Sequence, residues 1–149
     1  MRIALISCVS RKLEEAKGAK VAAKDLYVSP LFRMAYAYAE KLGVDRVYIL
    51  SAKYGLLEPG DPVEWYNETL LEQRTPYRRA WAERVLSALQ AKGVNMKEDT
   101  FYLLAGKIYY QYLLGEGKLQ NCEFPYDGQK GIGYILKFLK SSLQEYEEH

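Results

Sequence analysis

Histidine and cysteine are scarce in this chain. The only histidine is His149, the last residue of the sequence, where we expect no ordered catalytic role because chain ends are usually poorly ordered. A Ser-His-Asp or Cys-His catalytic site and histidine-based metal ligation are therefore excluded. The two cysteines, Cys8 and Cys122, form no CxxC motif and no disulfide framework. We expect no metal, no cofactor and a reducing, cytoplasmic location.

Long hydrophobic runs and a strong net charge are also missing. The longest apolar runs are far shorter than a membrane span, and the start of the chain, MRIALISCVS, lacks the length and cleavage site of a signal peptide. The 21 Lys and Arg residues against 19 Asp and Glu residues give a formal charge of +2, too small for the global field to attract polyanions. We expect no membrane contact, and any nucleic-acid contact requires a local patch.

What is present is typical of one folded α/β domain. The chain has 149 residues, of which 49% are hydrophobic and 27% charged, which suits a single core. Apolar, β-branched and aromatic runs predict strands at 2–8, 46–51 and 100–105, with a short fourth at 123–125. Helices are predicted between and after them, at 29–43, 75–93, 109–114 and 131–147.

This alternation predicts a three-layer α/β/α sandwich around a short, mainly parallel sheet of three to four strands. Ser29-Pro30 should open the first helix as cap and first residue. The last helix should turn Ile132 and Leu139 toward the core. The connection at 9–28 is long for a structureless loop, which suggests a functional segment.

Ligands of such sheets bind at the carboxyl ends of the strands. Small hydroxyls and cations follow all three main strands in this sequence: Ser7, Cys8 and Lys12 after the first, Ser51, Lys53 and Tyr54 after the second, and Gly106 and Lys107 after the third. For any single one of these residues a structural explanation is the commoner one, since serines and glycines often end strands and lysines are often solvated. Taken together, the residues that follow the three strands predict a pocket at this edge of the sheet.

The second strand end, SAKYGLL at 51–57, is the most distinctive. Lys53 could bind phosphate as a point charge or act as a base or nucleophile, and the alternative is a surface lysine. Tyr54 would present a phenol, and Gly55 allows close backbone approach or a positive φ. Of the 14 tyrosines, most should be packing residues, and Tyr27, Tyr54 and Tyr66 are expected in the pocket.

Asp61 is the candidate base in a chain without an internal histidine. It lies in the turn EPGDP, shortly before Trp65 and Tyr66, whose rings could stack on a planar base. A turn aspartate that binds its own backbone is the commoner explanation.

Weaker signals point to phosphate. An arginine stripe on the second helix, with Arg78 at its centre, could track a phosphate backbone, although acidic residues dilute it. Gly131 and Gly133, at the start of the last helix, could seat an anion on free N–H groups. The chain has no Walker pattern and no complete GxGxxG, so these glycines could equally serve close packing.

Several motifs together resemble a bacterial and phage family of uncharacterised domains. They are S-C-x-x-x-K at 7–12, L-Y-x-S-x-L-F at 26–32 and I-L-S-A-K-Y-G-L at 49–56, with Gly131-Ile132-Gly133 near the end. The resemblance covers nearly the whole chain, and it adds Ser29, within the second motif, to the binding candidates. That family is more distantly similar to YaaA peroxide-stress proteins and to the uracil-DNA-glycosylase-like domain of archaeosine synthase.

The resemblance implies a glycosylase-like α/β sandwich, and related domains accompany enzymes that install 7-deazaguanine bases in phage DNA. This chain departs from the family pattern at two places. Asn67 stands where an acidic residue often follows the tyrosine, and 125–128 (PYDG) matches the family's Pro-Leu-x-Gly loosely. Classical uracil-excision motifs are absent, so uracil excision is not implied.

The resulting hypothesis is an enzyme that acts on a nucleobase, a nucleoside or a modified base in nucleic acid. Lys53, Asp61 and Tyr66 would be its catalytic residues, with the strand-end serines, lysines and tyrosines as binding groups. The alternatives are a DNA- or RNA-binding protein without catalysis and a nucleotide-sensing domain.

Overall fold

The central sheet has five strands. The computed structural model describes residues 1–7 and 12–147, with 145–147 described for the backbone only. The strands are β1 (Arg2–Ser7), β3 (Arg46–Ser51), β4 (Gly55–Leu57), β6 (Thr100–Leu104) and β7 (Cys122–Glu123), in the spatial order β4-β3-β1-β6-β7. Of the strand pairs that the described residues form in this sheet, only β3–β4 is antiparallel. The mainly parallel α/β sheet is confirmed, whereas the expected number of strands, three to four, was too small, since the sheet has five.

The missed strand is β4, which folds straight back onto β3. Ser51 pairs with Gly55 across a tight turn, and Gly55 has a φ of +78°, a conformation that glycine adopts without steric cost. The sequence predicts a strand that ends at Ser51 and turn residues directly after it, because the three residues of β4 are too few to show an alternating pattern.

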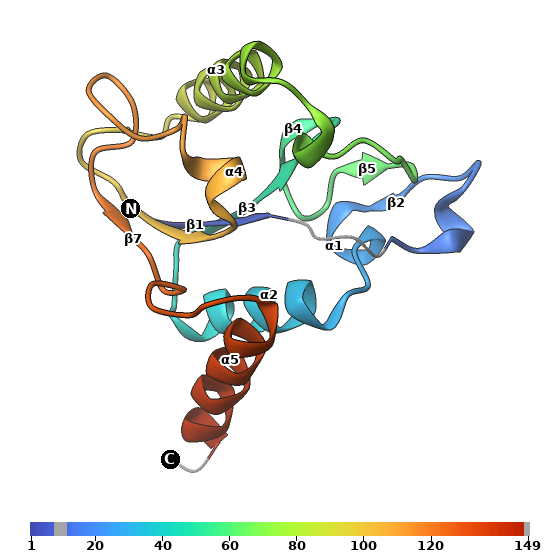
Figure 1. The fold of residues 1–149 in the computed structure, drawn as a ribbon, viewed down its shortest axis with the longest axis vertical. Helices are drawn as coiled ribbons and strands as arrows, with labels where there is room; N and C mark the ends of the chain where they lie inside the picture. The colour runs from blue at the N-terminus through green and yellow to red at the C-terminus, as the bar shows by residue number, and fades with distance from the viewer. Residues whose placement is uncertain (8–11, 148–149) are drawn as a thin grey trace.

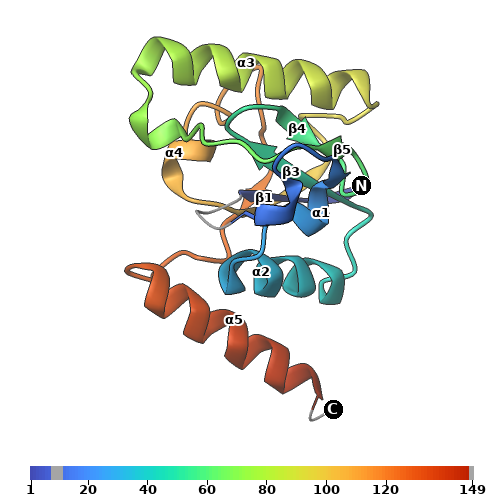
Figure 2. The same ribbon diagram turned by 90° about the vertical axis from the view of Figure 1, so that its right-hand side faces the viewer.

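Helices cover both faces of the sheet, and they begin near the predicted places. α2 (Pro30–Lys41) lies on one face and α3 (Thr75–Ala91) on the other, as Figure 2 shows. The Ser29 hydroxyl accepts a hydrogen bond from the Phe32 N–H at 3.2 Å, so the predicted cap is confirmed. α4 (Lys107–Tyr110) is a short helix after β6.

The last helix, α5 (Ile132–Glu147), packs outside α2 and not on the sheet (Figures 1 and 2). Tyr38 of α2 and Phe138 of α5 join the two helices, with ring centroids 5.7 Å apart. Leu139 is buried as expected, but the expectation for Ile132 was wrong, since that side chain is 56% exposed. The reason is that Ile132 borders a cavity and is not packed against the hydrophobic core.

The connection between β1 and α2 is not structureless. Its described part, residues 12–28, holds the 3-10 turn η1 (Glu14–Ala16), the strand β2 (Val21–Ala22) and the short helix α1 (Ala23–Leu26). β2 pairs with β5 (Pro62–Val63) in a separate two-stranded sheet. A further 3-10 turn, η2 (Leu70–Glu72), precedes α3.

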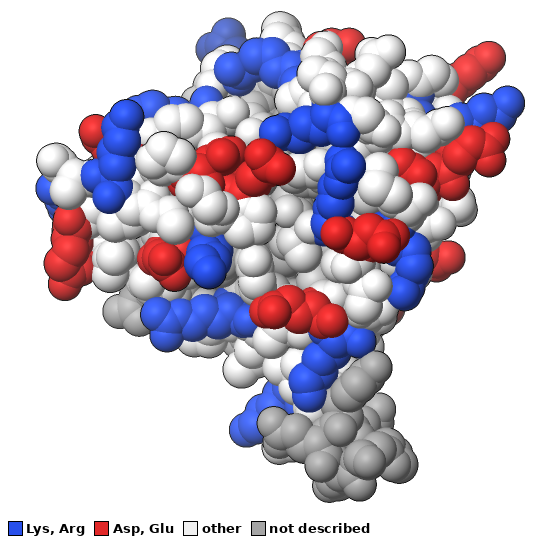
Figure 3. All heavy atoms as spheres, turned by 180° about the vertical axis from the view of Figure 1, so that it is seen from behind, with Lys and Arg blue, Asp and Glu red and all other residues white. Residues whose placement is uncertain are grey.

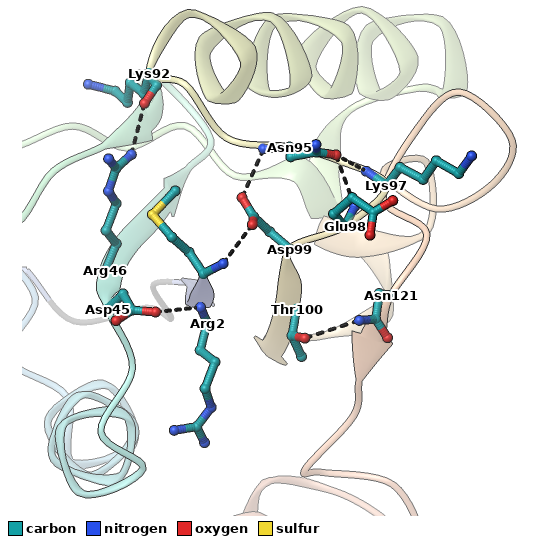
Figure 4. Close-up of polar contacts among 11 residues, drawn as sticks. Arg2, Asp45, Arg46, Lys92, Asn95, Lys97, Glu98, Asp99, Thr100 and Asn121 are labelled. Carbon is teal, nitrogen blue, oxygen red and sulfur yellow. Dashed lines mark hydrogen bonds and ion pairs between the residues drawn. The ribbon is translucent and has the colours of Figure 1, made fainter.

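Polar contacts tie the amino ends of the strands together (Figure 4). The Met1 ammonium lies 2.7 Å from Asp99, whose other carboxylate oxygen accepts a hydrogen bond from the Asn95 N–H at 2.8 Å. Asp45 accepts from the Arg2 N–H at 2.7 Å. The hydrogen bond from the Met1 ammonium lowers the pKa of Asp99. These contacts connect the amino ends of the strands, at the end of the sheet opposite the carboxyl ends.

Candidate functional site

Three hydroxyl groups form a buried hydrogen-bonded chain at the carboxyl end of β3. The Ser51 Oγ donates to the Tyr66 hydroxyl at 2.9 Å, and that hydroxyl lies 2.8 Å from the Tyr27 hydroxyl. The Tyr54 N–H donates to Ser51 Oγ at 3.0 Å. The Lys12 ammonium lies 4.4 Å from the centre of the Tyr66 ring, a cation–π contact. We call these five residues, which the structure brings together, the tyrosine cluster.

Elements distant in sequence hold the tyrosine cluster in place. Ser51 is the last residue of β3, and its carbonyl oxygen accepts a hydrogen bond from the Trp81 indole of α3 at 2.7 Å. Lys12 and Tyr27 form an isolated antiparallel bridge between the two ends of the β1–α2 connection. Ser51, Tyr27 and Tyr66 are almost entirely buried. Because the hydroxyls are shielded from water, the chain is suited to hold one phenol in a fixed position or to pass a proton along it.

A cavity of about 390 Å³ lies beside the carboxyl ends of β1 and β6, and we call it the switch-point cavity. Ser7 ends β1 and contributes its hydroxyl, and Leu104 ends β6. The rings of Tyr109 and Tyr126 add aromatic surface to a lining that is otherwise mainly apolar. The volume falls within the range of about 300–1,000 Å³ that is typical of small-molecule sites.

Chain topology explains why the cavity forms there. From the central β1 the chain crosses through α2 to β3 on one side, and then through α3 to β6 on the other. The connections therefore leave β1 and β6 in opposite directions, which keeps a crevice open between their carboxyl ends. The register places Ser7 opposite Leu50, one residue before Ser51. The switch-point cavity and the tyrosine cluster thus lie at the ends of neighbouring strands.

The electrostatics of the switch-point cavity favour neutral groups. A tyrosine phenol is protonated at neutral pH and can donate, and burial raises the pKa of Tyr126 still further above its ordinary value. Among the described residues, Lys107 is the one charged side chain in the lining. No group of three or more potential metal ligands occurs within residues 1–7 and 12–147.

Comparison with known proteins identifies the family. A model of a family of unknown function, DUF6884, matches residues 3–141. The chain belongs to the DUF6884 family. It is also similar to the uncharacterized protein YfjM of Bacillus subtilis (strain 168), with 31% identity over 150 residues that cover 99% of this chain and 98% of that protein. The motif-based recognition of an uncharacterised family is therefore confirmed.

In this DUF6884 chain, none of the three predicted catalytic residues, Lys53, Asp61 and Tyr66, lines the switch-point cavity. Tyr27 and Tyr54, which were expected in the pocket, do not line it either. Lys53 is exposed, and its ammonium lies 5.4 Å from the centre of the Tyr54 ring. Asp61 accepts a hydrogen bond from the Glu58 N–H at 2.8 Å, and its own N–H donates to the Glu58 carbonyl at 3.0 Å. The structure thus shows the backbone contacts of a turn aspartate, which was the alternative to a catalytic base for Asp61.

Other candidates of this DUF6884 chain have structural contacts. Ser29 caps α2, and Arg78 donates to the carbonyls of Leu70 and Leu71 at 2.8 and 3.2 Å, so its guanidinium braces η2. Gly131 has a φ of +107° just before α5. Gly133 lies in the first turn of α5, and Gly55 lies in the β3–β4 turn. Cys8 lies outside the described residues.

Sequence reasoning missed most of the walls of the switch-point cavity in this DUF6884 chain. Leu71, Leu104, Tyr109 and Tyr126 are apolar or aromatic residues, which look the same in sequence whether they line a cavity or fill a core. The available signal was the Gly106-Lys107 pair at the third strand end, which was noted without its neighbours. Within the described residues, no helix combines the length and the apolar character needed to cross a membrane.

Proposed function

We propose that this DUF6884 protein is an enzyme that acts on a nucleobase, a nucleoside or a modified base of the 7-deazaguanine type, held in the switch-point cavity. The observation that carries the proposal is the position of this cavity, between the strand ends where open α/β sheets bind their ligands. The resemblance to glycosylase-like domains adds the class of ligand, and the glycosidic bond or a substituent of the base is the proposed point of attack.

The lining of the cavity suits a flat heterocycle. The rings of Tyr109 and Tyr126 offer aromatic surface for stacking, and Leu104 adds an apolar wall. The Ser7 hydroxyl, itself almost fully buried, can accept from or donate to a polar edge of the base. A site with few polar groups on apolar walls fixes orientation through those few groups.

The tyrosine cluster supplies the proposed reactive part. Tyr66 is held by Ser51 and polarised by the cation of Lys12 over its ring, and the cluster lies one strand away from Ser7. Lys53 lies on the adjoining β3–β4 turn, outside the cavity lining, and its proposed role is to bind a developing anion through its long side chain. Asp61 is left out of the proposal because its carboxylate already binds the turn.

The alternative of a non-catalytic nucleic-acid binder has less support. Arg78, at the centre of the arginine stripe, already donates to two carbonyls, and the guanidinium carbon of Arg79 lies 4.8 Å from the centre of the Tyr112 ring. On the face in Figure 3, Lys and Arg side chains alternate with Asp and Glu side chains. A surface that tracks a phosphate backbone needs a continuous run of cations, which this face does not present.

Ligand screening with a blocked variant tests the proposal. Nucleobases, nucleosides, 7-deazaguanines and short oligonucleotides would be screened by thermal shift, and hits would be assayed for products by mass spectrometry. Gly106 lines the cavity with an ordinary φ, and a Cβ there meets no atom within 4 Å. Gly106→Leu should therefore fold normally and lose binding. Gly60→Leu is the matched control, because Gly60 is equally open and is not among the residues that line the cavity.

The outcomes separate the candidate functions. Binding and turnover that Gly106→Leu abolishes and Gly60→Leu retains would support the enzyme. Lys53→Ala should keep binding, because Lys53 is outside the lining, and lose turnover. Binding of oligonucleotides alone, with a steep salt dependence and no base preference, would refute the proposal in favour of backbone binding. Tight binding of a free nucleotide without product would indicate a sensor.

A further inference from the structure

A second, smaller cavity of about 240 Å³ adjoins the switch-point cavity. The two share four lining residues: Gly106, Lys107, Tyr126 and Ile135. Taken alone, the smaller cavity is below the size of about 300 Å³ at which small-molecule sites usually begin. Its place beside the larger cavity makes it suitable as a subsite for a second part of one ligand.

The lining of the smaller cavity differs in chemistry from that of the larger. Tyr110 and Phe124 form an aromatic pair with ring centroids 5.3 Å apart. The loop after β7 adds Asp127 and Gln129, whose carboxylate and amide are acceptors and donors for hydroxyl groups. An aromatic surface below a polar rim is suited to a compact group that has C–H bonds on one side and hydroxyls on the other.

The loop that carries these side chains is held by its own backbone. The Asp127 N–H donates to the Phe124 carbonyl at 3.0 Å, and the Gln129 N–H donates to the Tyr126 carbonyl at 3.0 Å. The structure assigns the Asp127 carboxylate no hydrogen bond or ion pair within the described residues. The carboxylate is therefore available to a ligand without loss of a contact that the fold needs.

The charges of the smaller cavity argue for an uncharged ligand group. Among the described residues its lining carries one cation, Lys107, and one anion, Asp127. A phosphate would meet the carboxylate as well as the ammonium, and like charges at short range are repulsive. A pair of neighbouring hydroxyls instead donates to both oxygens of a carboxylate, which is how acidic residues recognise ribose in nucleotide-binding folds.

We propose that the smaller cavity is a ribose subsite and that the ligand of this protein is a ribonucleoside, with Asp127 as the residue that determines specificity for its 2′- and 3′-hydroxyls. The proposal rests on the proposed function, since it takes the base to be in the switch-point cavity. Tyr126 lines both cavities and would contact the nucleoside near the junction of base and sugar.

Matched ligands test the subsite. Adenine, guanine, hypoxanthine and uracil, their ribonucleosides and their 2′-deoxyribonucleosides would be titrated by calorimetry. For the base that binds, the ribonucleoside should bind about tenfold more tightly than the 2′-deoxyribonucleoside, because the exposed Asp127 carboxylate accepts one more hydrogen bond from the 2′-hydroxyl. Asp127→Asn should remove this preference and leave the affinity for the free base unchanged. Asp25→Asn, at an exposed aspartate outside both cavities, should keep the preference.

The possible results distinguish a failure of the ribose subsite from a failure of the proposed function. A base that binds without any gain from its ribose, or a ribose preference that survives Asp127→Asn, would overturn the subsite and leave the proposed function standing. Binding of none of these bases and nucleosides, together with no binding of 7-deazaguanines in the ligand screen, would overturn both. Thermal unfolding of Asp127→Asn at the wild-type temperature would show that the variant is folded, as the absence of a side-chain contact within the described residues leads us to expect.

Discussion

The hydroxyl chain of the tyrosine cluster should contribute measurably to stability. Tyr66→Phe removes the oxygen that accepts from Ser51 Oγ at 2.9 Å and lies 2.8 Å from the Tyr27 hydroxyl. Ser51 is fully buried, so its hydroxyl would lose its acceptor where water cannot replace it. A buried polar group left without its partner costs about 1–3 kcal/mol, so we expect the free energy of unfolding to fall by about 2 kcal/mol.

Urea denaturation measures this loss, which should move the midpoint by about 1 M because m is typically about 1–3 kcal/mol/M for small domains. Ser51→Ala should cost about 1–2 kcal/mol, and the double variant should cost less than the sum, with a coupling of about 1 kcal/mol. Tyr134→Phe, at a side chain that is 61% exposed, is the matched control and should change little. A Tyr66→Phe midpoint equal to that of the control, or strict additivity, would refute the hydrogen-bonded chain.

Two further predictions concern groups with shifted pKa values. The hydrogen bond from the Met1 ammonium lowers the pKa of Asp99 in the folded protein, so the unfolded chain binds more protons in acid and this stabilisation is lost as the pH falls below about 4. Asp99→Asn should have a smaller free energy of unfolding than the wild type at pH 7, and urea titrations at lower pH should show this difference shrinking. A difference in the free energy of unfolding that does not change with pH would contradict the ion pair. Burial raises the pKa of Cys122 to about 11. In a Cys8→Ser variant, the remaining thiol should therefore react with iodoacetamide at pH 8 on the order of 100-fold more slowly than a free cysteine. Alkylation at the rate of a free cysteine would contradict this prediction and show that Cys122 is accessible.

Much of the fold follows from local signals. The strands at 46–51 and 100–104 and the helix after Ser29 lie where apolar runs and capping residues predicted them, because these signals act over a few residues. β4 escaped prediction since three residues in a turn have no periodicity of their own, and they are a strand only because β3 offers a free edge. The exposed position of Ile132 could not be read from the sequence, since an amphipathic pattern does not show which neighbour a helix packs against.

Some residues of the candidate site could likewise be predicted from the sequence, and others could not. Ser7, Ser51 and the cluster tyrosines could be selected from the sequence, because parallel strands bring their carboxyl ends to one edge. The walls of the two cavities could not, since Leu104, Tyr109 and Phe124 are apolar or aromatic residues of the kind that any core contains. For Asp61 the sequence left two explanations open, a base and a turn aspartate, and the structure shows the turn contact to Glu58.

By itself, the sequence determined the class of fold, the family and the residue types available for chemistry at the strand ends, because composition, capping and strand patterns are properties of short segments. Only the tertiary structure decided that the phenol of Tyr66 is buried against Ser51, that α5 packs on α2, and that a cavity lies beside the paired carboxyl ends of β1 and β6. These features depend on the direction of the crossovers and on how distant side chains pack, and no local stretch of sequence contains that information.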